Sequence, residues 1–346
     1  MRYKLLGSSG LRVSELCLGT MTFGSDEAWC ANKAQSHAML NAFVEAGGNF
    51  IDTADIYTNG ESEKVVGEFV ANDRERFVVA TKYSNAFPGA GDANAAGNQR
   101  KNLIQSLDAS LKRMKLDYID VYWMHNWDFT TPIDEAMRTL DDAVRAGKIL
   151  YIGLSDAPAW VCARANAIAE LRGWTQFVSM QLEYSLTERG IEREHFPLCR
   201  ETDMAITAWS PLASGILSGK YTRGGDDTKR LDTIPFHDQD DKKLEVARVV
   251  DSVADDMGAT SAQVALAWVR QRGTIPILGV RTMAQLEDNL ASLNVTLNDD
   301  QLGQLEAVSG IAYGHPYDFF DKPLVQALTT GGMGDLIDNH RDPRKG

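Results

Sequence analysis

Four side chains with complementary proton chemistry stand at or just beyond the ends of short apolar runs: Asp52, Tyr57, Lys82 and His125. A tyrosine phenol titrates near about 10 and is a weak acid at neutral pH, but an adjacent lysine ammonium stabilises the phenolate and lowers that pKa. An aspartate beside the lysine limits the cost of burying its charge. A histidine can hydrogen-bond a carbonyl oxygen and orient it. Tyr57 would then be a general acid toward that oxygen.

Each of these side chains, taken alone, has a simpler explanation. A lone aspartate at a strand end is more often a loop cap, and a lone histidine is more often structural. Their joint placement on consecutive runs changes this balance, because catalytic residues of parallel barrels lie at the carboxyl ends of the strands. The sequence therefore predicts that all four point into one mouth.

Eight short apolar or β-branched runs alternate with helical stretches along the chain, which is typical of βα units and a parallel sheet. The helical stretches include residues 33–46, 99–114, 134–146 and 262–272, with Asn32 and Thr260 as N-caps and glycines at several ends. Eight such units favour a closed (β/α)8 TIM barrel over a doubly wound sheet. The predicted strands are residues 16–20, 50–54, 77–82, 119–125, 149–155, 177–182, 205–210 and 275–280.

Three segments fall outside the eight units, within what we expect to be one barrel domain spanning residues 1–346. Residues 1–15 predict a β-hairpin with a turn at 7–10 that caps the lower end of the barrel. Residues 212–241 form a long loop on the cofactor side. The aromatic-rich tail, residues 311–346, suits a C-terminal substrate loop, although a packed terminal segment explains it equally well.

Composition excludes several classes of protein. Acidic residues outnumber basic ones by 48 to 35, and the formal charge of −13 disfavours nucleic acid and anionic membranes as partners. No signal peptide and no apolar run long enough to span a membrane is visible, so we expect a cytoplasmic protein. The cysteines, Cys17, Cys30, Cys162 and Cys199, show neither disulfide nor zinc-site spacing. We expect reduced, mostly buried thiols and no metal.

The residues around the four side chains resemble the aldo-keto reductase family over roughly residues 3–310. The tract Phe50-Ile-Asp-Thr-Ala-Asp-Ile-Tyr57, followed by Gly60-Glu-Ser-Glu63, is similar to that family's first signature. Its aspartate and tyrosine match Asp52 and Tyr57, its lysine matches Lys82, and its histidine matches His125. The resemblance implies reduction of an aldehyde or ketone by NADPH, reversible with NADP+.

The same resemblance implies a set of dinucleotide contacts. The carboxamide of the nicotinamide would meet Ser155 and Gln181, the ring would stack on Trp209, and residues 210–220 would form the pyrophosphate loop. Arg281, a guanidinium beside a helix N-terminus, suits a 2′-phosphate and argues for NADPH over NADH. The full set of predicted cofactor residues is Gly19, Thr20, Met21, Asp52, Ser155, Asp156, Gln181, Trp209, Ser210, Pro211, Leu212, Ser214, Gly215, Lys220, Gly279, Arg281, Gln285, Asp288 and Asn289.

One position departs from the family pattern, because asparagine commonly follows the serine of the fifth barrel strand and this chain has Asp156. An ionised carboxylate accepts hydrogen bonds but cannot donate them. Asp156 can still accept from the carboxamide nitrogen. Its charge would favour the positively charged oxidised nicotinamide.

Substrate, oligomeric state and the direction of reaction in the cell are not determined by the sequence. Trp29, Tyr83, Phe87 and Trp127 are candidates for the wall of a pocket that accepts a small carbonyl compound. A regulatory subunit of the same fold that senses its cofactor, as potassium channel β-subunits do, is the alternative function. A metal-dependent hydrolase barrel is disfavoured, because the remaining histidines do not cluster at strand ends.

Overall fold

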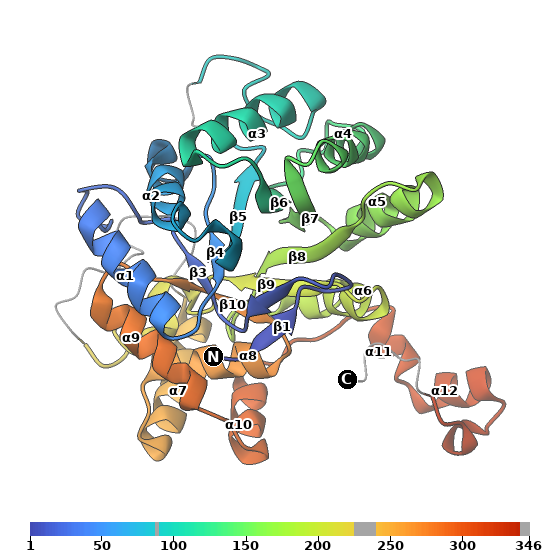
Figure 1. Cartoon of the computed structure of the whole chain (residues 1–346). Helices are drawn as coiled ribbons and strands as arrows, with labels where there is room; N and C mark the ends of the chain where they lie inside the picture. The colour runs from blue at the N-terminus through green and yellow to red at the C-terminus, as the bar shows by residue number, and fades with distance from the viewer. Residues whose placement is uncertain (87–89, 225–239, 340–346) are drawn as a thin grey trace.

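The computed structural model describes residues 1–86, 90–224 and 240–339. Its centre is a closed barrel of eight parallel strands in the order β10-β3-β4-β5-β6-β7-β8-β9, so the predicted TIM barrel is confirmed. Helices surround it, as Figure 1 shows. The strands are β3 (Cys17–Gly19), β4 (Phe50–Asp52), β5 (Val78–Tyr83), β6 (Ile119–Met124), β7 (Ile149–Ser155), β8 (Phe177–Glu183), β9 (Ala205–Trp209) and β10 (Ile275–Gly279).

The helices follow the strands in the expected alternation. Asn32 and Thr260 each cap a helix with a capping box, as their side-chain types predict. The α-helices are α1 (Lys33–Glu45), α2 (Glu61–Val70), α3 (Arg100–Met114), α4 (Ile133–Arg145), α5 (Ala159–Arg172), α6 (His195–Glu201), α7 (Asp241–Met257), α8 (Ser261–Gln271), α9 (Met283–Ala291), α10 (Asp299–Ser309), α11 (Tyr317–Phe320) and α12 (Pro323–Thr330). Short 3-10 helices are η1 (Tyr57–Gly60), η2 (Arg74–Arg76), η3 (Gly190–Glu192), η4 (Ala213–Ser218), η6 (Ser292–Asn294) and η7 (Gly334–Leu336).

The lower half of the barrel interior is filled by apolar side chains. Phe50, Ala80 and Trp123 come from three neighbouring strands and belong to one buried cluster. Gly153 makes room for this layer, because a Cβ at that position would lie 2.1 Å from the Trp123 ring. The layer gives the barrel a packed centre rather than a pore.

The N-terminal hairpin closes this lower end, as predicted. Its strands β1 (Tyr3–Leu5) and β2 (Arg12–Ser14) are antiparallel, and the Leu6 amide donates to the Leu11 carbonyl across the turn at 7–10. Leu6 and Val13 are fully buried in the same cluster as the lower barrel layer. The hairpin therefore contributes to the core and does not merely cover it.

Alternation along each strand decides which residues reach the upper half of the interior. Lys82 lies two residues beyond Ala80 on β5, and His125 lies two beyond Trp123 at the end of β6. On β8 the pairing with β7 shifts, with Ile152 opposite Phe177 but Gly153 opposite Ser179. This bulge resets the alternation, and the side chain of Gln181 reaches Asp52 inside the barrel.

The end of the chain departs from the expectation. Figure 1 shows α11 and α12 extending away from the barrel, and neither helix has a buried residue. In this structure residues 311–339 therefore do not form the predicted substrate wall, nor are they a packed terminal segment. Half of the loop at 212–241, residues 225–239, lies outside the described residues. The single-domain assignment stays a prediction.

Among the helices of the described ranges, none is both long enough and apolar enough to cross a lipid bilayer.

Candidate active site

The structure brings the four predicted side chains together at the carboxyl ends of β4, β5 and β6. Lys82 Nζ donates to Asp52 Oδ2 at 2.5 Å, to the Thr53 carbonyl at 2.7 Å and to Tyr57 Oη at 3.0 Å. These three bonds use all the donors of the ammonium group. Lys82 is fully buried. Its bonds to Asp52 and to the Thr53 carbonyl fix the position of the ammonium group, so the third N–H points at Tyr57.

Tyr57 is positioned by a sharp turn that follows β4. Thr58 and Asn59, the next two residues, have left-handed backbone conformations with φ of 46° and 57°. The Thr58 hydroxyl holds the turn by donating to the Phe23 carbonyl at 2.7 Å and accepting from the Ser62 amide at 2.9 Å. Strained backbone of this kind is common where a side chain must be aimed into a site.

The charge on Lys82 is secured by its neighbours. Burial disfavours the ammonium, but the charge of Asp52 and the contacts with Asp52 and Tyr57 outweigh it and raise the pKa of Lys82. Burial also raises the pKa of Tyr57, and the opposing effect of Lys82 is smaller. Our expectation of a lowered tyrosine pKa is therefore wrong, since desolvation of the phenolate dominates. Tyr57 is protonated at neutral pH and can donate.

His125 lies beside Tyr57, with ring centroids 6.0 Å apart and an interplanar angle of 82°. Burial, and then the charge of Lys82, lowers the pKa of His125 well below its usual value. The imidazole is therefore neutral at pH 7. Its Nδ1 is buried without a hydrogen-bond partner among the described residues.

Glu183 is a site residue that the sequence analysis missed. It follows Gln181 by two residues on β8, so both side chains face the same way, and its backbone pairs with Trp209 of β9. Burial, and then the charges of Glu188 and Asp156, raises the pKa of Glu183 to about 7. Because side chains alternate between the two faces of a strand, counting two residues on from Gln181 could have identified Glu183 as an inward-facing carboxyl group.

Asp156 and Trp209 contact each other across the mouth. Trp209 Nε1 donates to Asp156 Oδ1 at 2.9 Å, and Asp156 has a left-handed backbone with φ of 39°. Desolvation raises the pKa of Asp156 to about 6, although the bond from Trp209 and the charge of Lys82 oppose it. Ser155, the preceding residue, is buried and pairs with Gln181 in the sheet. The predicted nicotinamide contacts thus converge on one side of the mouth.

The segment after β9 has the curved backbone expected of a phosphate loop. Ser210, Ala213 and Ser214 all have positive φ, and Gly215 continues the run with φ of 94°. A Cβ at Gly215 would lie 2.7 Å from Cε of Lys220, so the lysine side chain crosses directly over the glycine. Left-handed turns with a nearby cation are typical of anion sites. This cradle, including Pro211 and Leu212, fits a dinucleotide pyrophosphate.

The predicted cofactor residues from Arg281 to Asn289 lie just before α9 and along it. The Arg281 amide donates to Gln285 Oε1 at 2.9 Å, which holds Arg281 next to the helix N-terminus. Asn289 is buried, whereas Asp288 accepts hydrogen bonds from Thr260 and Gln263 of the neighbouring helix α8. Asp288 therefore has a structural role independent of any cofactor.

The remaining cofactor candidates line the ends of β3 and β10. Gly19 and Gly279 pair with each other, and Gly279 is exposed, which leaves open backbone at this edge. The hydroxyl of Thr20 is buried between the Asp52 carbonyl and Ser62. Thr20 thus supports the backbone of β4. The next residue, Met21, is half-buried in the loop that follows β3.

The predicted substrate residues have different outcomes. Tyr83 is wrong as a mouth residue, because it follows Lys82 on β5 and points outward, where it is fully buried and stacks on Tyr122 at 5.3 Å. Trp29 is half-buried and donates to Glu27, and Trp127 is half-buried beside Phe129. Both stay predictions. Phe87 lies outside the described residues.

No group of histidine, cysteine, aspartate or glutamate side chains within the described ranges has the arrangement of a metal site. The four cysteines are free thiols, three of them buried, as predicted.

The fold and this site define a barrel enzyme with a buried lysine that supports a tyrosine acid. Comparison with known proteins agrees: the aldo/keto reductase family model matches residues 15–309. A norsolorinic acid reductase of Emericella nidulans is 37% identical over 329 residues, covering 91% of this chain and 83% of the relative. An aryl-alcohol dehydrogenase of Pestalotiopsis microspora is 37% identical, covering 92% and 85%. An aryl-alcohol dehydrogenase [NADP(+)] of Phanerodontia chrysosporium is 33% identical, covering 92% and 88%.

The chain therefore belongs to the aldo/keto reductase family, and the resemblance predicted from its motifs is confirmed. Its reaction class is NAD(P)H-dependent carbonyl reduction.

Proposed function

We propose that this protein uses NADPH to reduce an aldehyde or ketone carried on an aryl group, with Tyr57 as the proton donor. The observation that carries the proposal is the position of Lys82, whose buried ammonium bridges Asp52 at 2.5 Å and Tyr57 at 3.0 Å. Two kinds of relative, named for norsolorinic acid and for aryl alcohols, support the aryl class of substrate.

The residues of the mouth perform separate tasks. The neutral imidazole of His125 hydrogen-bonds the substrate carbonyl oxygen and turns it toward Tyr57. NADPH, held by the predicted cofactor residues, would supply the hydride for the carbonyl carbon. Tyr57 Oη gives its proton to the oxygen, and the ammonium of Lys82 stabilises the phenolate that remains. Asp52 keeps Lys82 charged and in place.

The protonation state of Tyr57 sets the preferred direction at each pH. Because burial raises the pKa of Tyr57, the phenol is protonated at neutral pH, and Lys82 assists the proton transfer by stabilising the phenolate that forms. Alcohol oxidation needs the phenolate, so its rate should rise as pH increases toward the tyrosine pKa. The preference for NADPH over NADH rests on Arg281 beside the N-terminus of α9, where a 2′-phosphate would meet positive charge.

The test is NADPH oxidation, followed by its absorbance, with a panel of aryl and aliphatic aldehydes and ketones. Wild type and Tyr57→Phe are measured in parallel. We expect turnover in wild type and a loss of roughly 100- to 10,000-fold in kcat in the variant, with NADPH binding retained.

Tyr83→Phe is the matched control, because its buried hydroxyl has no hydrogen-bond partner among the described residues and faces away from the mouth. It should keep wild-type turnover. Tight NADPH binding by a wild-type protein that turns over none of the panel would instead favour the cofactor-sensing regulatory function.

A further inference from the structure

Apolar side chains are concentrated on the segment that leaves the barrel at residues 311–339, which we name the C-terminal arm. Eight of its large hydrophobic residues are exposed, more than half of those on the whole described surface, and Leu324 and Leu328 are more than 70% exposed. These two leucines are four residues apart on α12 and share a helix face. Apolar surface gathered in this way usually marks an interaction site.

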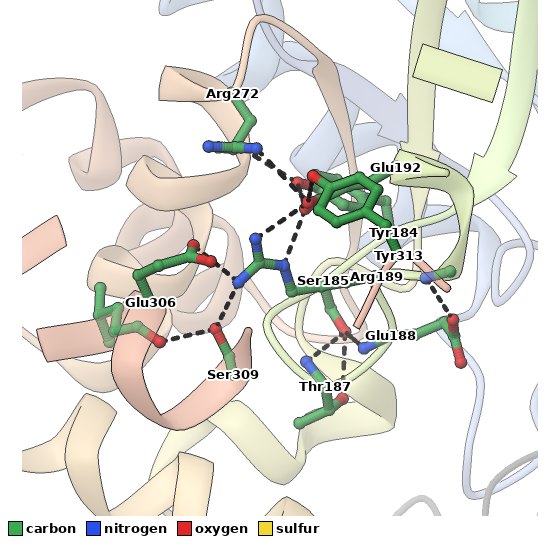
Figure 2. A network of polar contacts seen from close by, with 12 residues as sticks. Tyr184, Ser185, Thr187, Glu188, Arg189, Glu192, Arg272, Glu306, Ser309 and Tyr313 are labelled. Carbon is green, nitrogen blue, oxygen red and sulfur yellow. Dashed lines mark hydrogen bonds and ion pairs between the residues drawn. The ribbon is translucent and has the colours of Figure 1, made fainter. Parts of the chain in front are cut away.

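The root of the arm is anchored by the polar network in Figure 2. Buried Arg189 binds Glu192 through Nε at 2.8 Å and Nη2 at 2.9 Å, and its Nη1 binds Glu306 at 2.9 Å. Tyr313 Oη, at the start of the arm, donates to Glu192 Oε2 at 3.3 Å. Arg193 also donates to the Ala312 carbonyl at 2.9 Å. These bonds fix the first residues of the arm, Ala312 and Tyr313, to the barrel.

A second unpartnered apolar surface lies on α5 of the same chain. Trp160, Ala163, Ala167 and Leu171 are exposed and recur at helical spacing, so they form one stripe along the solvent side. Two alanines between two large side chains let another helix approach closely. We name these four residues the α5 stripe.

The charges of the two surfaces are complementary. Over residues 311–339 the arm carries Asp318, Asp321, Asp335 and Asp338 against one cation, Lys322, and the sequence that follows adds Arg341, Arg344, Lys345 and Asp342. Arg164, in the middle of the α5 stripe, is 61% exposed and makes only a 3.9 Å contact with Asp134. The aspartates beside the apolar side chains of the arm suit this partner.

We propose that the C-terminal arm docks on the α5 stripe of a second copy of this chain, so that two copies exchange arms in a symmetric dimer. Stable interfaces bury roughly 800 Å² per partner, and each large aromatic side chain can bury roughly 150–250 Å². Because each copy gives one arm and receives one, the exposed side chains of both surfaces are buried together. Reciprocal use of the same two patches is the usual form of a twofold interface.

The first test is sedimentation velocity of the full chain from low to high micromolar concentration. Wild type should be a dimer, and Leu324→Glu/Leu328→Glu should raise the dimer dissociation constant by roughly 30-fold or more. Ala167→Arg, on the acceptor stripe, should weaken the dimer in the same way. Ile104→Glu, which changes an exposed apolar residue of α3, is the matched control and should leave the dimer intact.

Mixing the two defective chains tests the exchange itself. The Leu324→Glu/Leu328→Glu chain retains its acceptor stripe and Ala167→Arg retains its arm, so the mixture can form one of the two contacts. We expect heterodimers tighter than either variant alone forms with itself.

Several outcomes would overturn the proposal. A monomeric wild type at high micromolar concentration excludes the dimer, and binding of such a monomer to phosphatidylcholine vesicles would assign the arm to a lipid surface instead. A dimer that tolerates the arm variant, or one that tolerates Ala167→Arg, places the interface elsewhere. Unchanged melting temperatures of the variants ensure that misfolding does not explain a lost dimer.

Discussion

The two halves of the barrel interior are built from the same strands but have opposite chemistry. Below, Phe50, Ala80 and Trp123 pack with the N-terminal hairpin into an apolar layer. Above, residues two positions further along β4 and β5 form the buried ion pair of Asp52 and Lys82. β4 and β5 thus each contribute one inward residue to the apolar layer and the next inward residue to the site. The apolar layer provides a rigid base on which the charged layer is held.

The largest expected effect is that of Lys82→Met, which tests whether the upper layer serves chemistry alone. Turnover should fall by roughly 1,000-fold or more, because Tyr57 loses the charge that stabilises its phenolate. The free energy of unfolding should also fall by about 3–5 kcal/mol, because Asp52 remains buried with its cation removed. Steady-state kinetics and urea unfolding at pH 7 measure the two effects.

Asp52→Asn/Lys82→Met is the companion variant, since it removes the unpaired charge while leaving the site inactive. It should recover most of the lost stability and none of the turnover. Equal stability of the single and double variants would contradict the buried charge as the cause.

The next effect concerns the lower layer. Leu6→Ala removes a fully buried side chain of the hairpin and should reduce the free energy of unfolding by about 2–5 kcal/mol. The kcat/KM should stay within about twofold, because Leu6 packs in the lower apolar cluster and not against the polar groups of the mouth. Leu5→Ala is the control, since its side chain is 59% exposed and its loss should cost little. A large drop in kcat/KM for Leu6→Ala would show that the layers are not separable.

Arg281→Gln tests the predicted contact with the 2′-phosphate, outside both layers of the barrel interior. We expect an intermediate effect on cofactor binding. Removing a charge-assisted bond to a 2′-phosphate should raise the dissociation constant of NADPH by roughly 10- to 100-fold. The dissociation constant of NADH should be unchanged, because it lacks that phosphate. Fluorescence titration with both cofactors checks this, and parallel losses for the two would contradict the assigned role.

The smallest effect is the redox preference set by Asp156. Its pKa of about 6 means that the carboxylate is charged above pH 6 and neutral below it. Its charge favours the oxidised nicotinamide, so the ratio of NADPH to NADP+ dissociation constants should fall several-fold from pH 8 to pH 5. Both cofactor forms share the same phosphates, whose titration cancels in the ratio. Asp156→Asn should flatten this pH dependence, and an unchanged profile would refute the charge argument.

Sequence patterns predicted the elements and the four central side chains well because both depend on local order. Apolar runs mark the strands, and parallel strands bring their carboxyl ends to one mouth whatever the details of packing. Tyr83 was misplaced, because adjacent residues of a strand face opposite sides of the sheet. With the side chain of Lys82 in the barrel mouth, that of Tyr83 must point outward. Glu183 was missed because the predicted strand ended at residue 182, whereas β8 continues to Glu183 and keeps the alternation that starts from Gln181.

The protonation of Tyr57 shows a different kind of limit. The sequence places a lysine near the tyrosine but not the burial of either, and the balance between desolvation and charge decides the sign of the pKa shift. The same holds for the C-terminal arm, whose aromatic composition suited a pocket wall. Its position outside the barrel depends on where the network around Arg189 directs the chain.

The order of strands, helices and polar strand ends is encoded residue by residue, so the sequence by itself determined the barrel, the family and the members of the central site. Which face each side chain takes, how far its charge is desolvated and which surfaces stay uncovered depend on contacts between residues distant in the chain. Only the tertiary structure decided these properties, because burial and electrostatic interaction arise from three-dimensional proximity rather than from neighbouring positions.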